Sequence, residues 1–293
     1  MRVLVGTDAG LSQVNAQTRD VLLADPIDAL VVDGGDWLAI AEGQRVVRAG
    51  TELGRLRGLT ARCVLAGGDG VLVGTSEAHL VRVAEGSAQR VPSFDRVPSR
   101  DTWYTPWGGP PDTRSLSRGA GGEVYANVHV GGILRSDDGR SWRTTAMDVD
   151  ADVHQVLAHP TEPGVAFAAT AIGLATTRDG GDSWEFTDDG LHAAYCRAVA
   201  VAGDVLLLSA SRSHTGRDAA LYRRAIDGGS FERCIAGLPD WFGDNLDTYC
   251  LDARGSAAAL GTSDGRVFVS SDAGATWSAA AEGLGAISCL ALA

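Results

Sequence analysis

A short repeated motif is the feature of this sequence that most restricts its fold. The pattern (S/T)-x-D-x-G-x-(S/T)-W occurs at residues 177–184 and 270–277, and residues 135–142 match it except for Arg135 at the first position. A shorter copy, with Phe in place of Trp, occupies residues 227–231. The aspartates of the three fuller copies are 42 and 93 residues apart, which is one unit and two units of a repeat of roughly 46 residues. Such a period is typical of an array or ring of similar units.

The composition of the motif predicts a β-turn. Asp and Ser/Thr side chains can bond to backbone groups of the turn, and Gly can take its positive-φ position. The Trp can pack back onto the sheet and anchor the hairpin. The residues to which we assign these structural roles are Asp137, Gly139 and Trp142; Asp179, Gly181 and Trp184; and Asp272, Gly274 and Trp277.

The motif resembles the Asp-box, or BNR repeat, of sialidase-like and related β-propellers, and the resemblance covers residues 120–277 directly. In that family the box is structural and lies away from the binding face, so the resemblance implies a propeller and says little about activity. Sialidases of this group use an arginine clamp, a Tyr–Glu nucleophile pair and an Asp acid/base. They have six blades, and their N-terminal Phe/Tyr-Arg-Ile/Leu-Pro segment is absent here.

Short apolar segments separated by Gly-rich turns predict one all-β domain, residues 1–293, folded as a single seven-bladed β-propeller with four antiparallel strands per blade. The N-terminus supplies three strands without an inner one, and residues 286–293 resemble the inner strands, so we expect the C-terminal strand to close the first blade. The expected blades are 1–26 plus 285–293, 27–58, 59–93, 94–147 (with a long loop), 148–188, 189–238 and 239–284.

The charge balance excludes several classes of function. The net charge is −12, and every one of the 25 basic residues is arginine. An acidic chain without lysine is a poor ligand for nucleic acid or an anionic membrane surface, and it has no Schiff-base or P-loop lysine. Five cysteines, an odd number, together with an N-terminus that lacks a signal-peptide pattern, favour reduced thiols and a cytoplasmic location.

A functional site is expected on the face opposite the Asp-boxes, where the blade-to-blade loops lie. Two loops there are rich in aromatic residues: one contains Trp103 and Trp107, and the other contains Trp241. They could form a platform for a sugar or an aromatic ligand. The alternative is that the first loop folds over the ring and buries its tryptophans.

Inner strands begin at this face, so arginines, histidines and carboxylates of blades 4 to 7 should meet at the channel mouth. The candidate ligand-binding residues are Trp103, Trp107, Arg114, His129, His154, His192, Arg197, Arg212 and Trp241. The candidate catalytic residues are His154, Tyr195, Asp247 and Tyr249. Arginine is suited to a carboxylate or phosphate, but structural Arg–Asp pairs between blades remain the alternative.

The sequence predicts neither a metal nor a cofactor. His129, His154 and His192 come from three blades and could converge on an ion, but no local spacing supports this. Two functions stay open. The first is binding or processing of a polar, anionic small molecule or glycan at the mouth, as in a hydrolase or lyase. The alternative is a non-catalytic protein-interaction or assembly platform, which should expose an apolar patch.

Overall fold

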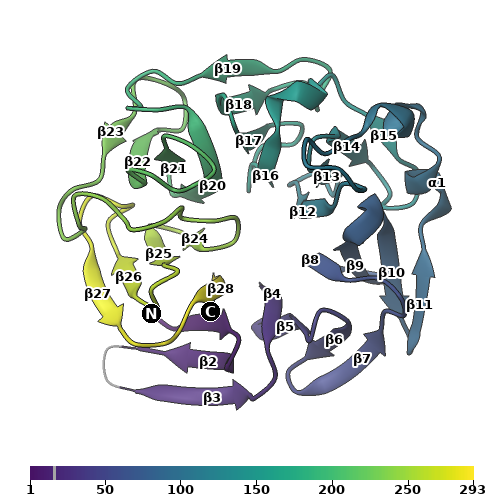
Figure 1. Ribbon diagram of the computed structural model, residues 1–293, viewed down its shortest axis with the longest axis horizontal. Coiled ribbons are helices and arrows are strands. Elements are labelled where there is room, and N and C mark those ends of the chain that lie inside the picture. Colours follow the sequence, from purple (N-terminus) through teal and green to yellow (C-terminus); the bar gives the residue numbers. More distant parts are fainter. Residues whose placement is uncertain (16–17) are drawn as a thin grey trace.

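The computed structural model describes residues 1–15 and 18–293, and it forms a ring of seven four-stranded antiparallel sheets around a central channel (Figure 1). The predicted seven-bladed β-propeller is therefore confirmed. The inner strands, which surround the channel, are β4 (Ile27–Asp33), β8 (Ala61–Gly67), β12 (Thr113–Arg118), β16 (Val153–Ala158), β20 (Tyr195–Ala202), β24 (Leu251–Arg254) and β28 (Ile287–Leu292).

The remaining strands of each blade follow outward from the channel. The second strands are β1 (Val3–Thr7), β5 (Asp36–Ala41), β9 (Gly70–Thr75), β13 (Val124–Val128), β17 (Ala166–Thr170), β21 (Val205–Ser211) and β25 (Ala257–Gly261). The third strands are β2 (Gly10–Val14), β6 (Arg45–Arg48), β10 (Leu80–Ala84), β14 (Gly132–Ser136), β18 (Gly173–Thr177), β22 (Ala220–Ala225) and β26 (Val267–Ser270). The outer strands are β3 (Arg19–Leu23), β7 (Thr51–Arg55), β11 (Ser87–Arg90), β15 (Arg143–Thr144), β19 (Glu185–Thr187), β23 (Glu232–Arg233) and β27 (Ser278–Ala281).

Helical turns are few and short in the described residues, and none is long and apolar enough to cross a membrane. They are α1 (Pro92–Asp95) and the 3₁₀ turns η1 (Ser76–Ala78), η2 (Pro98–Thr102) and η3 (Val149–Ala151). Both α1 and η2 begin with proline, which suits the first helical position because that position needs no N–H donor.

The first blade is built from both ends of the chain, as the sequence predicted. Strand β28 pairs antiparallel with β1, and Val3 lies opposite Leu292. The Ala293 N–H also donates to the carbonyl of Arg2 at 3.0 Å. Figure 1 shows the two termini beside each other at this seam. This pairing gives the first blade its fourth, inner strand.

The core is divided into seven apolar clusters, and each cluster joins two neighbouring blades. The clusters arise because both faces of a blade are covered, so inner and second strands are apolar on both sides. All five cysteines are free thiols buried in these clusters. Burial raises the pKa of Cys63 and of Cys289 to about 12, so these thiols stay protonated and inert.

Two of the Asp-box turns have the hydrogen bonds that the motif predicts. Asp179 accepts from Thr177 Oγ1 at 2.8 Å and from the N–H and hydroxyl of Ser183 at 2.9 and 2.6 Å. Asp272 accepts the equivalent bonds from Ser270 and Thr276. These bonds join the third strand to the outer strand of blades 5 and 7.

The first copy requires a correction. The carboxylate that holds its turn is Asp138, which accepts from Ser136 Oγ, Ser141 N and Ser141 Oγ. Asp137 instead pairs with Arg135, with 2.8 Å between Oδ1 and Nη2. The turn is one residue shorter than the other two, so an alignment without gaps selects the wrong aspartate. Gly139 still takes a positive φ of 68°, and Trp142 is buried.

The motif tryptophans should contribute strongly to stability. Trp277 is 6% exposed, and its Nε1 donates to the Gly274 carbonyl at 3.1 Å. We predict that Trp277→Ala lowers the free energy of unfolding by about 3–5 kcal/mol in chemical denaturation, as large aromatic truncations in cores do. Trp107, which is 68% exposed, provides the matched control, because Trp107→Ala should change the free energy of unfolding by less than about 0.5 kcal/mol. Equal effects of the two substitutions would contradict the assignment.

The Asp-box carboxylates should also make stability depend on acid. Hydrogen bonds from Thr276 and Ser270 lower the pKa of Asp272 from 3.8 to about 2. A pKa that is lowered in the folded state stabilises that state above the unfolded pKa, and the gain is lost as pH falls toward the folded pKa. The difference in unfolding free energy between wild type and Asp272→Asn should therefore shrink between about pH 4 and pH 2. A difference that stays constant over this range would contradict the prediction.

Candidate functional site

A β-bulge near the start of the inner strand places a polar residue at the channel mouth in six of the blades. In five of these ladders one position of the inner strand has no partner on the second strand, and in the ladder of β20 two positions have none. The polar residues at these bulges are Asp28, Arg62, Arg114, His154, Arg197 and Ser288. A bulge re-aims a side chain and is common beside functional sites. Inner strands start on the face opposite the Asp-box turns, so this mouth lies on the face that the sequence analysis selected.

The mouth is a polar cavity of about 360 Å³. Arg197 Nη1 lies 2.9 and 2.8 Å from the two carboxylate oxygens of Asp247, and Arg114 Nη2 lies 3.2 Å from the first of them. Arg62 pairs with Asp112 at 2.9 Å. Burial works against the charge on Asp247, but the two guanidinium groups more than offset it and hold its pKa below the ordinary value. The Arg–Asp pairs that the sequence left open as an alternative are thus present, with two arginines on one carboxylate.

Tyr249 fills the channel below this cavity. Its backbone is left-handed, with φ of 64°, and its hydroxyl accepts from the Leu116 N–H of β12 at 3.0 Å. It lines both the mouth cavity and a larger, more apolar cavity of about 530 Å³ that also reaches Val31, Leu65 and Leu157. Burial raises the pKa of Tyr249 well above its ordinary value. Tyr249, which the sequence analysis proposed as catalytic, is therefore a neutral side chain that occupies the channel.

His154, Tyr195 and His129 form a cluster of mutually tilted rings at one side of the mouth. The His154 ring is fully buried, and its centroid lies 4.7 Å from that of Tyr195 and 5.7 Å from that of His129. His129 also lies 5.3 Å from the exposed ring of Trp107. Asp152 joins the group, because its Oδ1 lies 2.9 Å from His129 Nε2.

The two tryptophans of the long loop have different positions. Trp103 packs against Phe94, with ring centroids 6.3 Å apart, and lies under the guanidinium of Arg100. Trp107 remains exposed. Between them, the Tyr104 hydroxyl donates to Asp150 at 2.8 Å and ties the loop to η3. The loop therefore packs Trp103 against the ring, as the alternative expected, but it leaves Trp107 exposed.

The other predicted ligand residues form a separate group over blade 6. His192 Nδ1 lies 2.7 Å from the Tyr222 hydroxyl, and its ring is 4.9 Å from Trp241. The Arg233 guanidinium covers the Trp241 ring at 3.7 Å. Arg212 pairs with Asp218 at 2.6 Å. His192 therefore contacts the loops of blades 6 and 7 and does not join His129 and His154.

Sequence reasoning missed several residues of the mouth: Asp28, Arg62, Asp112, Asp152 and Ser288. A usable signal was present. The inner strands of blades 1 to 3 begin Ile-Ser-Cys, Ile-Asp-Ala and Ala-Arg-Cys, with a polar residue between two apolar ones. Aligning the inner strands on this triplet would have identified the bulge position in each blade.

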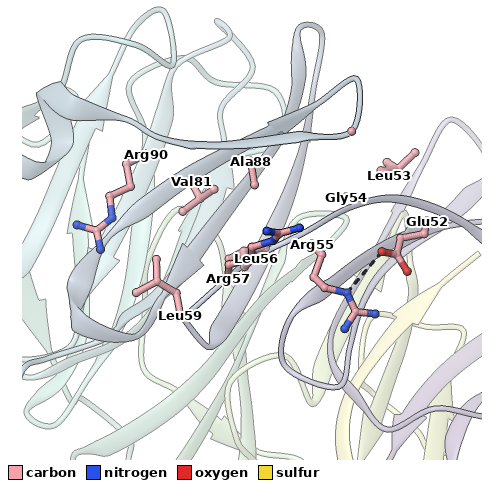
Figure 2. A pocket seen from close by; sticks show the side chains of 11 residues that line it. Glu52, Leu53, Gly54, Arg55, Leu56, Arg57, Leu59, Val81, Ala88 and Arg90 are labelled. Atoms are coloured by element: carbon pink, nitrogen blue, oxygen red, sulfur yellow. Dashed lines mark ion pairs between the residues drawn. The ribbon is translucent and has the colours of Figure 1, made fainter.

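A further cavity, of about 660 Å³, lies away from the mouth, between the outer strands of blades 2 and 3 (Figure 2). Its floor is formed by Leu56, Leu59 and Val81. Figure 2 shows Arg55 turned toward Glu52, and the distance between Arg55 Nε and Glu52 Oε1 is 3.6 Å. None of the predicted site residues lines it. It is an open groove at the rim, and it does not share residues with the channel mouth.

Comparisons with known proteins identify the fold. No protein-family model matches the chain, and no curated protein matches its sequence. The chain is similar to the solved WD40 repeats of RRP9, with a TM-score of 0.64 and 13% identity over 99% of this chain and 89% of that one. It is also similar to YCF48 bound to D1 peptide, with a TM-score of 0.57 and 15% identity over 93% and 85%. An ancestral GH74 enzyme matches with a TM-score of 0.61 and 14% identity over 91% of this chain and 37% of the enzyme. Together they place the chain among seven-bladed β-propellers.

Proposed function

We propose that this propeller is a non-catalytic interaction module that binds a segment of a partner protein across the channel-mouth face. The observation that carries the proposal is a set of large apolar side chains left exposed on that face. Its members are 40–68% exposed: Tyr104, Trp107, Ile172 and Trp241. Water-exposed tryptophan and tyrosine are typical of protein interfaces, where they supply most of the binding energy.

The polar groups of the mouth support binding more than catalysis. The Tyr249 hydroxyl accepts a backbone hydrogen bond, and His154 Nδ1 is occupied by the Cys196 carbonyl at 2.6 Å. Asp247 is held by Arg114 and Arg197. A nucleophile within hydrogen-bond reach of a base, which covalent catalysis needs, is not formed by these candidates.

The similar structures add support at the level of the fold. One similar structure is YCF48 with D1 peptide bound, and another consists of the WD40 repeats of RRP9. We extend the proposal to membership of the Asp-box propellers, which is supported by the turns of Asp179 and Asp272. The five free buried thiols support a reducing compartment such as the cytoplasm.

A peptide library displayed on phage tests the proposal without knowledge of the partner. We predict that peptides selected on the wild-type protein bind it in calorimetry, and that Trp107→Ala or Trp241→Ala weakens them by about tenfold or more, as loss of an interface anchor does. Phe186→Ala is the matched control, because Phe186 is 41% exposed but lies on the outer strand β19. Absence of selected peptides, or equal weakening by Phe186→Ala, would contradict the proposal.

A second candidate, binding of a carboxylate- or phosphate-bearing small molecule or glycan, is favoured by one observation. Arg114 and Arg197 share a single carboxylate, and Arg197 Nε has no hydrogen-bond partner among the described residues. The second positive charge is thus available to an anion. Two results together would favour this candidate over the first. Small anions would raise the melting temperature of the wild type but not of Arg197→Ala, and no peptide would bind.

A further inference from the structure

Three side chains from two neighbouring blades converge beside the mouth with their ligand atoms toward one another. His129 follows β13, Asp152 lies between η3 and β16, and His154 is at the bulge of β16. The imidazole nitrogens and the carboxylate oxygen that they offer all lie within 4.8 Å of one another. Two imidazoles and a carboxylate are common ligands of divalent transition metals.

The tautomer of His154 is fixed by the backbone. Its Nδ1 lies 2.6 Å from the carbonyl oxygen of Cys196, and a carbonyl can only accept, so Nδ1 carries the proton. Nε2 then presents a lone pair. The side chain is fully buried, and Nε2 has no hydrogen-bond partner among the described residues. An imidazole that donates from one nitrogen to a carbonyl and keeps the other free is the usual arrangement of a metal-ligating histidine.

Asp152 presents acceptors to the same space. Its Oδ2 lies 3.6 Å from His154 Nε2, too far for a hydrogen bond, and its Oδ1 lies 2.9 Å from His129 Nε2 without a well-directed hydrogen bond among the residues described. The residue is held in the left-handed region, with φ of 50° and ψ of 71°. Such backbone strain is frequent at ligand sites. Two acceptors that face each other repel unless a cation lies between them.

His129 Nε2 faces a donor and an acceptor at once, because it lies 3.4 Å from Arg114 Nη1 and 2.9 Å from Asp152 Oδ1. With its proton on Nδ1, His129 presents the Nε2 lone pair to the same space as His154 Nε2 and the Asp152 carboxylate.

We propose that His129, Asp152 and His154 bind one divalent transition-metal ion, through Nε2 of both histidines and the carboxylate of Asp152, with zinc as the representative ion. Three protein ligands leave a coordination position open, as in sites where the metal also takes water or another ligand. His129 lines the mouth cavity, so the open position faces it. The site does not depend on the proposed interaction with a protein segment.

Arg114 is the neighbouring charge that works against a cation. It is drawn toward Asp247, with 3.2 Å between Nη2 and Oδ1, which offsets part of its charge. A metal ion beside this guanidinium favours an anionic ligand at its open position, because both charges then attract it. A carboxylate group would meet this requirement.

The test is uptake of zinc ion by the folded chain. We expect wild type to bind one zinc ion, measured by calorimetry and by metal analysis after dialysis, and to give a visible absorption spectrum with cobalt(II). His129→Gln and Asp152→Asn should each weaken zinc binding by about tenfold or more. Asn tolerates the left-handed backbone at position 152. His192→Gln, which alters a histidine of the same face outside the cluster, should bind as wild type does.

Two results would overturn the proposal. One is a wild-type protein that takes up no zinc at micromolar concentration. The other is uptake that His129→Gln and Asp152→Asn leave unchanged. His154→Gln alters a fully buried side chain, so its result counts only if its circular dichroism and melting temperature match the wild type.

Discussion

The pairing of β28 with β1 is the interaction on which the other parts of the structure depend. Each of the seven apolar clusters joins two neighbouring blades, so the ring is continuous only if the first blade is complete. That blade uses strands from both ends of the chain. Opening any blade interface therefore strains all the others, and side chains from different blades keep fixed distances across the channel. This rigidity lets Asp247 of blade 7 hold Arg114 of blade 4 and Arg197 of blade 6 at once.

Within this rigid ring, the bulges convert packed inner strands into a polar mouth. A regular strand would turn its second residue into a blade interface, where a charged group would be costly to bury. The bulge frees that residue from the ladder, and it reaches the mouth while the next residue returns to the core. Cys63 and Cys289 follow Arg62 and Ser288 in this way, and both thiols are buried. The same device places His154 beside Asp152.

The sequence predicted the ring, its seven blades and the shared first blade, because turn chemistry and apolar strands are local properties. An alignment without gaps selected Asp137 in the first copy of the motif. The turn there is one residue shorter, so the hydrogen bonds are made by Asp138. The sequence could not separate Trp103 from Trp107, because the course of a long loop is set by contacts with distant residues such as Phe94 and Asp150. It grouped His192 with His129 and His154, although only the last two meet. Distances between blades follow from ring geometry, which residue spacing does not report.

The channel-mouth face is the proposed binding face of this propeller. Site-specific photo-crosslinking tests this proposal most directly, with a photoreactive amino acid at position 172 or 204 in cells that produce the protein. Ile172 is exposed in the turn between β17 and β18 on the mouth face, and Asp204 is exposed in the turn between β20 and β21 on the opposite face. We expect a discrete adduct from position 172 and none from position 204. An adduct from position 204 alone, or from neither position, would contradict the proposal.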